Sequence, residues 1–313
     1  MNRRNLIKGT LAGAATLGLG QSPLWASQKA QIKPKHNFTF CLNTSTIRQQ
    51  NLKFDEEIKL AAKVGFDGIE IWINKMQAYA EAGGSLADIK KMASDEGIVI
   101  EDAIGFAPWI VDNDEARAKG LEQMKREMDM LAQIGCKRVA APPIGATTGD
   151  LIDLEVVAKR FRKVCDLGQE MGVLPQLELW GFSKNMHLFG QTLFVAAECG
   201  HPDAVILPDV YHLKRGGSPF EALEMINGSK IQMFHMNDFP KMDDYSTMTD
   251  AMRVLPGDGV APYKEILGIL NRKNVPIALS LEIFNKDVWA MDAQKACELG
   301  LKKMKSAVEK AVA

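Results

Sequence analysis

The chain has 313 residues, of which 46% are hydrophobic and 25% charged, and this composition is typical of a globular protein with a large core. Its formal net charge is −1, so nothing in the composition indicates the basic surface that binds nucleic acid or an anionic membrane. The five cysteines form no C-x-x-C pair and do not resemble a disulfide framework, so we expect buried thiols. They are Cys41, Cys136, Cys165, Cys199 and Cys297.

The N-terminus has the layout of an export signal. Arg3 and Arg4 form a pair, a glycine- and alanine-rich apolar run follows, and Ala26 is a suitable last residue before cleavage. The RRNLIK order resembles a twin-arginine signal, which predicts a signal peptide over residues 1–30 and a periplasmic or otherwise exported protein. The run is shorter than the roughly 20 apolar residues that span a membrane, so we expect no stable membrane anchor. Residues 31–313 are then expected to form a single domain.

Short apolar runs alternate with amphipathic stretches through the rest of the chain. The predicted strands are Phe38–Asn43, Gly68–Trp72, Val99–Ala103, Arg138–Ala141, Leu174–Leu179, Ala204–Asp209, Ile231–Met236 and Ile277–Ile283. The predicted helices are Phe54–Val64, Leu86–Glu96, Asp114–Ile134, Leu151–Met171, Leu193–Cys199, Pro219–Asn227, Pro262–Asn271 and Asp292–Val312.

This alternation predicts an α/β protein with a parallel sheet and crossover helices. Eight such repeats that close on themselves form a (β/α)8 TIM barrel. An open doubly wound sheet is the alternative, but it usually has a glycine-rich phosphate loop after its first strand, and the sequence NTSTIRQQ at that place contains no glycine.

One connection is unusually long. Residues 239–259 are polar and directly follow the seventh predicted strand. Long loops in compact domains are often lids or binding loops, although a solvated insertion would have the same composition.

Four residues that can bind a metal fall at the predicted ends of four successive strands: Glu178, Asp209, His235 and Glu282. Each one alone has an ordinary explanation as an ion-pair partner or a hydrogen-bonded scaffold residue. Because the carboxyl ends of the strands converge at one end of a barrel, we expect the four side chains to meet there. Three carboxylates would be costly to bury without a cation, so the set predicts a divalent metal site.

The predicted ligands are three carboxylates and one imidazole, which favour Mn²⁺ first, with Mg²⁺ or Co²⁺ as alternatives. Zn²⁺ remains open, although it usually takes more nitrogen or sulfur ligands. Four protein ligands leave about two positions of a six-coordinate ion for neighbouring oxygens of a polyol or hydroxyketone. The pattern therefore predicts a small-molecule sugar or glycoside as substrate.

The sequence resembles the xylose isomerase-like barrel superfamily, in the group of sugar phosphate isomerases and epimerases. The resemblance spans nearly the whole mature chain. Its motifs are GFDGIEIW (65–72), ELW (178–180), PDVYH (208–212), FHMNDFP (234–240), LPGDG (255–259) and SLEIF (280–284). The resemblance implies that the four strand-end residues bind the metal and that His212 contacts the substrate.

The keto-sugar epimerase branch of that family implies a mechanism. Glu178 and Glu282 would flank a substrate carbon, so that one removes a proton next to a carbonyl and the other returns it on the opposite face through an enediolate. The branch has a second Glu and an Arg where this chain has Lys184 and Lys241. These departures leave open an alternative, a metal-dependent lyase or hydrolase of 3-keto-glycosides, which would use the same base.

Further candidates for substrate binding follow other strands. Glu70 lies near the end of the second strand, and Trp72, Trp109 and Trp180 could form an apolar wall for a sugar ring. His187 lies in a polar loop after Glu178. Each of these residues could equally serve packing or structural hydrogen bonds.

Two other functional classes share features with this chain. A repair endonuclease on the same barrel would need more histidines than the five present and a basic face. A non-catalytic sugar-binding protein would not need two carboxylates on opposite sides of a substrate carbon. A homo-oligomer is compatible with the sequence, which does not specify one.

Overall fold

A computed structural model describes residues 36–313, and Lys35–Ala313 form one compact unit. The predicted twin-arginine signal, residues 1–30, lies outside the described residues. None of the helices in the described part of the chain is both long enough and apolar enough to cross a membrane.

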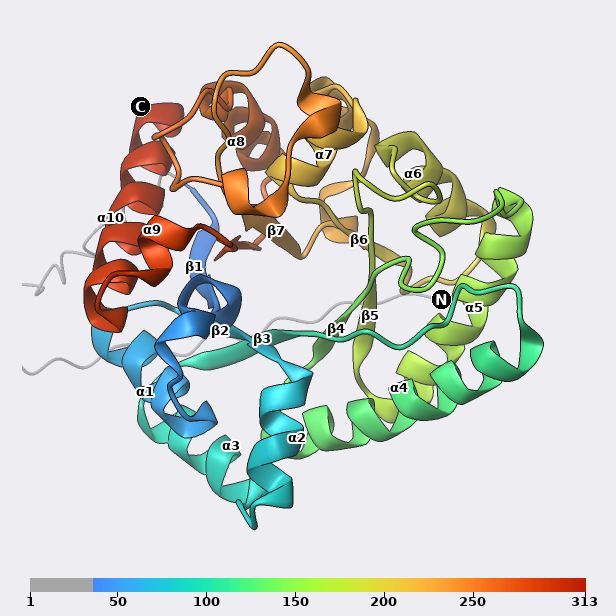
Figure 1. The fold of residues 1–313 in the computed structure, drawn as a ribbon, viewed down its shortest axis with the longest axis horizontal. Helices are drawn as coiled ribbons and strands as arrows, with labels where there is room; N and C mark the ends of the chain where they lie inside the picture. Colours follow the sequence, from blue (N-terminus) through green and yellow to red (C-terminus); the bar gives the residue numbers. More distant parts are fainter. Residues whose placement is uncertain (1–35) are drawn as a thin grey trace, which may run out of the picture. The chain divides into compact units, whose positions relative to one another are not determined.

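Parallel strands form the inner layer of this unit, and Figure 1 shows the helices arranged around them. The strands are β1 (Phe38–Asn43), β2 (Gly68–Trp72), β3 (Val99–Ile104), β4 (Arg138–Ala141), β5 (Leu174–Glu178), β6 (Val205–Leu207), β7 (Met233–Met236) and β8 (Ile277–Leu281). They are hydrogen-bonded in the orders β3-β2-β1-β8-β7 and β4-β5-β6. β3 lies beside β4, and a parallel bridge between Asp209 and His235 joins the β6 and β7 sides, so the fold is an eight-stranded α/β barrel.

The helices of the outer layer bury their apolar faces against these strands. They are α1 (Phe54–Val64), α2 (Ile73–Glu81), α3 (Leu86–Asp95), α4 (Asp114–Ile134), α5 (Leu154–Met171), α6 (Phe189–Glu198), α7 (Val210–Gly216), α8 (Tyr263–Arg272), α9 (Lys286–Trp289) and α10 (Ala293–Val312). Short 3-10 helices are η1 (Thr44–Gln50), η2 (Phe220–Met225), η3 (Gly228–Lys230), η4 (Tyr245–Thr247) and η5 (Asp250–Met252).

All eight predicted strands are present, but the last four are one to three residues shorter than predicted, the sixth most of all. β6 ends at Leu207 because Pro208 has no backbone N–H and Asp209 caps the next helix, α7, by accepting a hydrogen bond from the His212 N–H. The predicted helix Pro219–Asn227 is a 3-10 helix, and α2, α7 and α9 were not predicted. These helices are short and directly follow strands, so they leave little periodic pattern in the sequence.

Helix ends follow the usual capping chemistry. Gly65 and Gly135 end α1 and α4 in the left-handed conformation, with φ of 94° and 81°. Asn113 and Asp153 cap the starts of α4 and α5 by accepting hydrogen bonds from backbone N–H groups. The five cysteines are buried and free, as expected.

The long connection after β7 folds back over the barrel and is not a solvated insertion. An antiparallel bridge between Asp238 and Val254 closes its base. Met248 is buried, and its carbonyl accepts hydrogen bonds from Tyr211 and Arg215. The connection therefore has a fixed path, and this path carries Arg253 into the barrel, where only 1% of its surface is exposed.

Candidate active site

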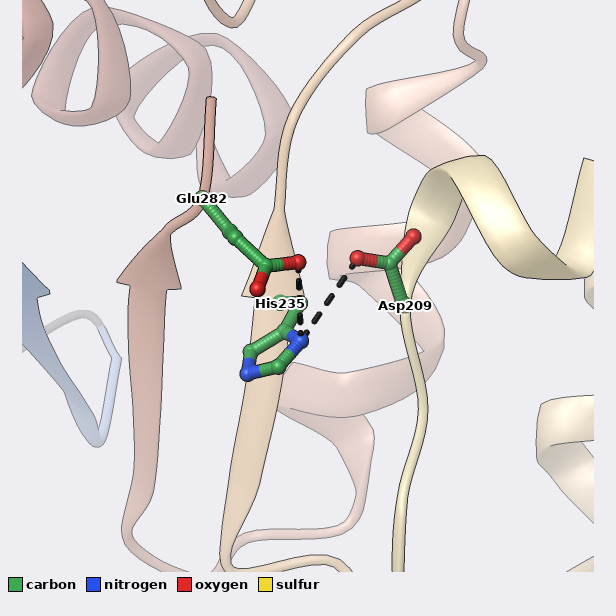
Figure 2. Close-up of side chains that lie close together, drawn as sticks. All are labelled: Asp209, His235 and Glu282. Atoms are coloured by element: carbon green, nitrogen blue, oxygen red, sulfur yellow. Dashed lines mark ion pairs between the residues drawn. The ribbon is translucent and has the colours of Figure 1, made fainter. Parts of the chain in front are cut away.

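The four predicted metal ligands converge at the carboxyl ends of the strands. Asp209, His235 and Glu282 each offer one ligand atom, and these atoms lie within 4.8 Å of one another. Figure 2 shows the two carboxylates pointing at the same edge of the imidazole ring. Nδ1 of His235 lies 3.3 Å from Glu282 Oε2, 3.6 Å from Asp209 Oδ2 and 3.9 Å from Glu178 Oε1. All four side chains are buried, so they form the floor of a site, which we call the acidic floor.

His235 is held in a fixed orientation by Glu70. Its Nε2 pairs with Glu70 Oε1 at 2.8 Å. The other carboxylate oxygen of Glu70 accepts hydrogen bonds from Asn43 Nδ2 at 2.8 Å and from Ser280 Oγ at 2.5 Å. A carboxylate behind an imidazole fixes the ring's tautomer and makes it a better ligand. Glu70 thus lies behind the floor, where its carboxylate contacts His235, Asn43 and Ser280, and the substrate contact expected for it stays a prediction.

The opposite nitrogen of His235, Nδ1, is buried and forms no hydrogen bond with the described residues. A buried polar atom without a partner is unusual and costly. Burial opposes a positive charge on this ring, but Glu282 and Glu70 outweigh burial and raise the pKa of His235 well above its usual value. A cation is thus favoured between Nδ1 and the carboxylates, either as a proton or as a metal ion that replaces the proton.

Arg253 is the main residue of the site that sequence reasoning missed. Its Nη1 donates hydrogen bonds of 2.7 Å to both Asp209 Oδ2 and Glu282 Oε2. Its Nη2 donates to Asp250 Oδ1 at 2.7 Å. Such charge-assisted hydrogen bonds hold the two carboxylates in place through the oxygens that also face His235 Nδ1. The only sequence signal is an arginine next to two apolar residues at the end of a polar loop.

The carboxylates of the floor differ in how readily they take up a proton. Burial raises the pKa of Glu178 to about 8, because the positive His235 only partly offsets burial and the neighbouring carboxylates repel its charge. Burial also disfavours the charge on Asp209, but Arg253 and His212 hold its pKa well below the usual range. Without a cation between them, Glu178 therefore takes up a proton more readily than Asp209.

His212 lies at the wall of the cavity as a neutral imidazole. Burial lowers its pKa to about 4. The backbone N–H of Gly181 donates to His212 Nδ1 at 3.2 Å, and Nη2 of Arg253, which can only donate, lies 3.3 Å from Nε2. Both ring nitrogens therefore face donors, and these contacts hold His212 at the cavity wall beside Arg253.

These groups surround one cavity of about 300 Å³. It is lined by Arg48, Trp72, Ile104, Phe106, Glu178, Trp180, Phe182, His212, Asp250, Arg253, Glu282 and Phe284. The polar groups lie at its base and aromatic rings form most of its side. A larger hollow of about 490 Å³ between the loop before α8 and α10 lies away from the strand ends and has no comparable convergence of side chains.

The remaining candidates from the sequence divide into two groups. Trp72 and Trp180 line the cavity, as expected. Trp109 is buried in the core and donates a hydrogen bond to the carbonyl of Pro142. His187 does not line the cavity; its backbone N–H donates to Gln191 Oε1 in the turn that begins α6. The substrate contact expected for the His187 side chain stays a prediction.

Comparison with known proteins places this arrangement in a wider group. Residues 58–307 match the family described as Xylose isomerase-like TIM barrel. Inosose isomerase from Bacillus velezensis is 25% identical over 279 residues, which are 86% of this chain and 97% of that protein. 3-Dehydroshikimate dehydratase from Pseudomonas putida is 25% identical over 257 residues, which are 80% of this chain but only 39% of that protein.

A solved structure confirms the fold. The crystal structure of the IolI protein with a bound zinc atom has a TM-score of 0.80 and is 23% identical to this chain. The match covers 87% of this chain and 99% of that one. At this identity the likeness shows the shared barrel and leaves the chemistry to be argued from the residues of each protein.

Proposed function

Because the chain belongs to the xylose isomerase-like TIM barrel family, we propose that it is a divalent-metal-dependent isomerase or epimerase that acts on a sugar. The observation that carries this proposal is the buried Nδ1 of His235, which has no hydrogen-bond partner and faces three carboxylates. The name of the Bacillus relative, an inosose isomerase, supports the same class of reaction.

The residues present fit a divalent cation. Asp209, His235 and Glu282 would hold it, with Glu178 as the fourth ligand. Three carboxylates favour Mn²⁺, Mg²⁺ or Co²⁺, and the zinc in the IolI structure keeps Zn²⁺ among the candidates. Such an ion would supply a Lewis acid and a template for adjacent substrate oxygens.

The side chains of the floor supply the proton transfers. We assign Glu178 as the base that removes a proton next to a carbonyl, because its buried carboxylate lines the base of the cavity. Glu282, which also lines the cavity and is held by Arg253, is assigned as the acid that returns the proton. His212, at the wall of the cavity, would contact the substrate beside the reacting carbon.

A second candidate is a lyase or hydrolase of 3-keto-glycosides. It needs the same proton abstraction, after which the substituent one carbon further on leaves. Two observations favour it: Lys184 and Lys241 differ from the epimerase branch, and one relative is a dehydratase. In both cases we propose export through the N-terminal twin-arginine motif, so that the enzyme meets its substrate outside the cytoplasm.

The experiment that tests both candidates is incubation of the protein, loaded in turn with Mn²⁺, Mg²⁺, Co²⁺ or Zn²⁺, in D₂O with a panel of ketoses and 3-keto-glycosides, followed by NMR. Deuterium should enter at the carbon next to the carbonyl of one substrate. An unchanged skeleton would identify the isomerase or epimerase, and release of a substituent would identify the lyase or hydrolase. If no member of the panel exchanged hydrogen for deuterium with any of the four metals, the proposed function would be wrong.

A further inference from the structure

The mouth of the cavity is surrounded by an unbroken series of aromatic rings. Trp72 and Phe106 have centroids 5.4 Å apart, Phe106 and Trp180 6.4 Å, and Trp180 and Phe182 5.3 Å. On the other side, Trp72 and Phe284 lie 6.3 Å apart. We call these five residues the aromatic collar.

Two polar residues beside the floor, His212 and Arg253, close the series into a ring. His212 lies 5.8 Å from Phe182, and its Nε2 is 3.3 Å from the guanidinium of Arg253. That guanidinium lies 5.1 Å from the centroid of Phe284. The collar therefore stands directly over the acidic floor and is continuous with it, so a ligand bound at the floor must pass through or remain inside the collar.

The collar keeps large apolar surface in contact with water. Phe106 is 38% exposed and Phe182 is 40% exposed. A single exposed phenylalanine is common on a protein surface, but five neighbouring rings around one cavity mouth are a built apolar surface. Burial of these rings by a ligand would be favourable by the hydrophobic effect and by ring-to-ring contact.

The collar offers few hydrogen-bonding groups to a ligand. Of its two indole N–H groups, that of Trp72 already donates to Asn43 Oδ1 at 3.2 Å. The polar groups that can bind sugar hydroxyls lie deeper, at Glu178, His212 and Glu282. A free monosaccharide would satisfy the floor and leave the exposed rings of the collar uncovered, whereas an apolar planar group attached to the sugar would cover them.

A positive charge stands at the rim of the collar. Arg48 is exposed, and its guanidinium lies 5.0 Å from the Trp72 ring, 6.0 Å from Phe284 and 5.7 Å from Trp289. No carboxylate among residues 36–313 forms an ion pair with Arg48. Stacking holds the guanidinium in position while its N–H groups stay available to an anion.

We propose that the collar binds an aromatic group carried by the sugar, so that the substrates are aryl 3-keto-glycosides, and that Arg48 favours aryl groups that carry a negative charge. This proposal rests on the proposed function for the position of the sugar at the floor. It adds the class of substituent, which neither the family nor the metal site specifies.

The test compares two ligands that differ only in the substituent, phenyl and methyl 3-keto-β-D-glucopyranoside. Binding to the Mn²⁺-loaded full chain is measured by calorimetry, which requires no turnover. We expect the phenyl glycoside to bind about tenfold or more tightly, since stacking on several rings acts on this ligand alone. The double variant Phe106→Ala/Phe182→Ala should reduce the preference to about twofold or less.

A matched control excludes a general effect of losing an exposed phenylalanine. Phe194 on α6 is 39% exposed and does not line the cavity, so Phe194→Ala should keep the full phenyl preference. Thermal unfolding of all variants checks that each is folded. Equal binding of the two glycosides by the unmodified protein, or no binding of the phenyl glycoside at millimolar concentration, overturns the proposal. So does an unchanged preference in the double variant.

The charge of Arg48 is tested with 4-carboxyphenyl 3-keto-β-D-glucopyranoside. Arg48→Gln should weaken binding of this ligand about three- to tenfold more than binding of the phenyl glycoside. Equal effects on both ligands would contradict the role of the charge. If the phenyl preference is found but no substrate exchanges hydrogen in D₂O, the proposed reaction is wrong and the proposed role of the collar is kept. If exchange occurs without a phenyl preference, the proposed reaction is kept and the role of the collar is wrong.

Discussion

The acidic floor and the aromatic collar are neighbours in one cavity, but they are built on opposite principles. The floor consists of buried ionisable groups, and hydrogen bonds hold Asp209 in place from Arg253, Asn237 and the His212 N–H. The collar consists of partly exposed rings that are held mainly by contact with one another. The floor can therefore fix reacting atoms in place, whereas the collar can select a ligand only by shape and apolar surface.

The floor and the collar also differ in the free-energy cost of burying charge. Carboxylates that converge in a buried site repel one another and lose hydration, so they require a cation. Arg253 supplies one positive charge, and the free Nδ1 of His235 marks the place for another. The collar has no such requirement, and substitutions there should change affinity without a large loss of stability.

Loss of the proton-transferring carboxylates should have the largest effect. Glu178→Gln and Glu282→Gln keep the shape of the floor but cannot take up and return a proton, so we expect hydrogen exchange at the substrate carbon to fall by about 10³-fold. NMR in D₂O measures this rate. Glu298→Gln on the exposed face of α10 is the matched control and should exchange at the normal rate. Exchange in either floor variant at the control's rate would contradict the assignment of that residue.

Glu70 provides a smaller test of the floor. Glu70→Gln loses the carboxylate behind His235 Nε2, and the metal affinity should fall about 10- to 100-fold, as is usual for such partners of a ligand. Titration of the metal-free protein with Mn²⁺ measures the dissociation constant without turnover. Glu127 is also a buried glutamate but lies on α4 and accepts a hydrogen bond from Gln123, so Glu127→Gln should bind Mn²⁺ normally. If Glu70→Gln and Glu127→Gln bound Mn²⁺ with equal affinity, Glu70 would have no part in metal binding.

A substitution in the collar should act mainly on substrate affinity. Trp180→Leu keeps an apolar side chain but loses the ring between Phe106 and Phe182, so we expect KM for an aryl glycoside to rise about fivefold or more, with a smaller change in kcat. Steady-state kinetics on the substrate identified by NMR separates the two constants. A fall in kcat with unchanged KM would place Trp180 with the floor instead.

Glu57 is a buried acid outside the floor and the collar, and burial is the main cause of its shifted pKa. Burial raises its pKa from 4.5 to about 7, and the nearby Lys75 only partly offsets burial. The folded protein thus binds this proton more tightly than the unfolded chain, so the group stabilises the fold most below pH 4.5, and this contribution is lost as pH rises through 7. The loss is at most about 3 kcal/mol. Denaturant unfolding at pH 5 and pH 8 should show a smaller decline for Glu57→Gln than for the unmodified protein; equal declines would contradict the raised pKa.

The strands and the floor could be predicted because both depend on local patterns and on one property of barrels. Each strand is a short apolar run, and the carboxyl ends of parallel strands converge, so residues such as Asp209 and Glu282 must approach each other once the strands are placed. Glu70 could also be picked out in the sequence, from its place near a strand end. Its contacts could not be predicted, because its hydrogen-bond partners come from three other strands.

Arg253 and the collar could not be predicted in the same way. The position of Arg253 depends on the path of the connection after β7, which is set by the Asp238–Val254 bridge and by buried contacts of Met248. Phe106 and Phe182 lie in loops beyond strand ends, and nothing in their neighbours in sequence indicates that they face one another across Trp180. Long-range geometry of this kind leaves no periodic trace in the sequence.

The account depends on a single cation held jointly by Glu178, Asp209, His235 and Glu282. The most direct measurement is anomalous diffraction at the manganese absorption edge from crystals of the Mn²⁺-loaded protein. We expect one strong anomalous peak between His235 Nδ1 and the three carboxylates, and its absence after treatment with a chelator. A protein that exchanges substrate hydrogen at the full rate but shows no peak at this place would contradict the account.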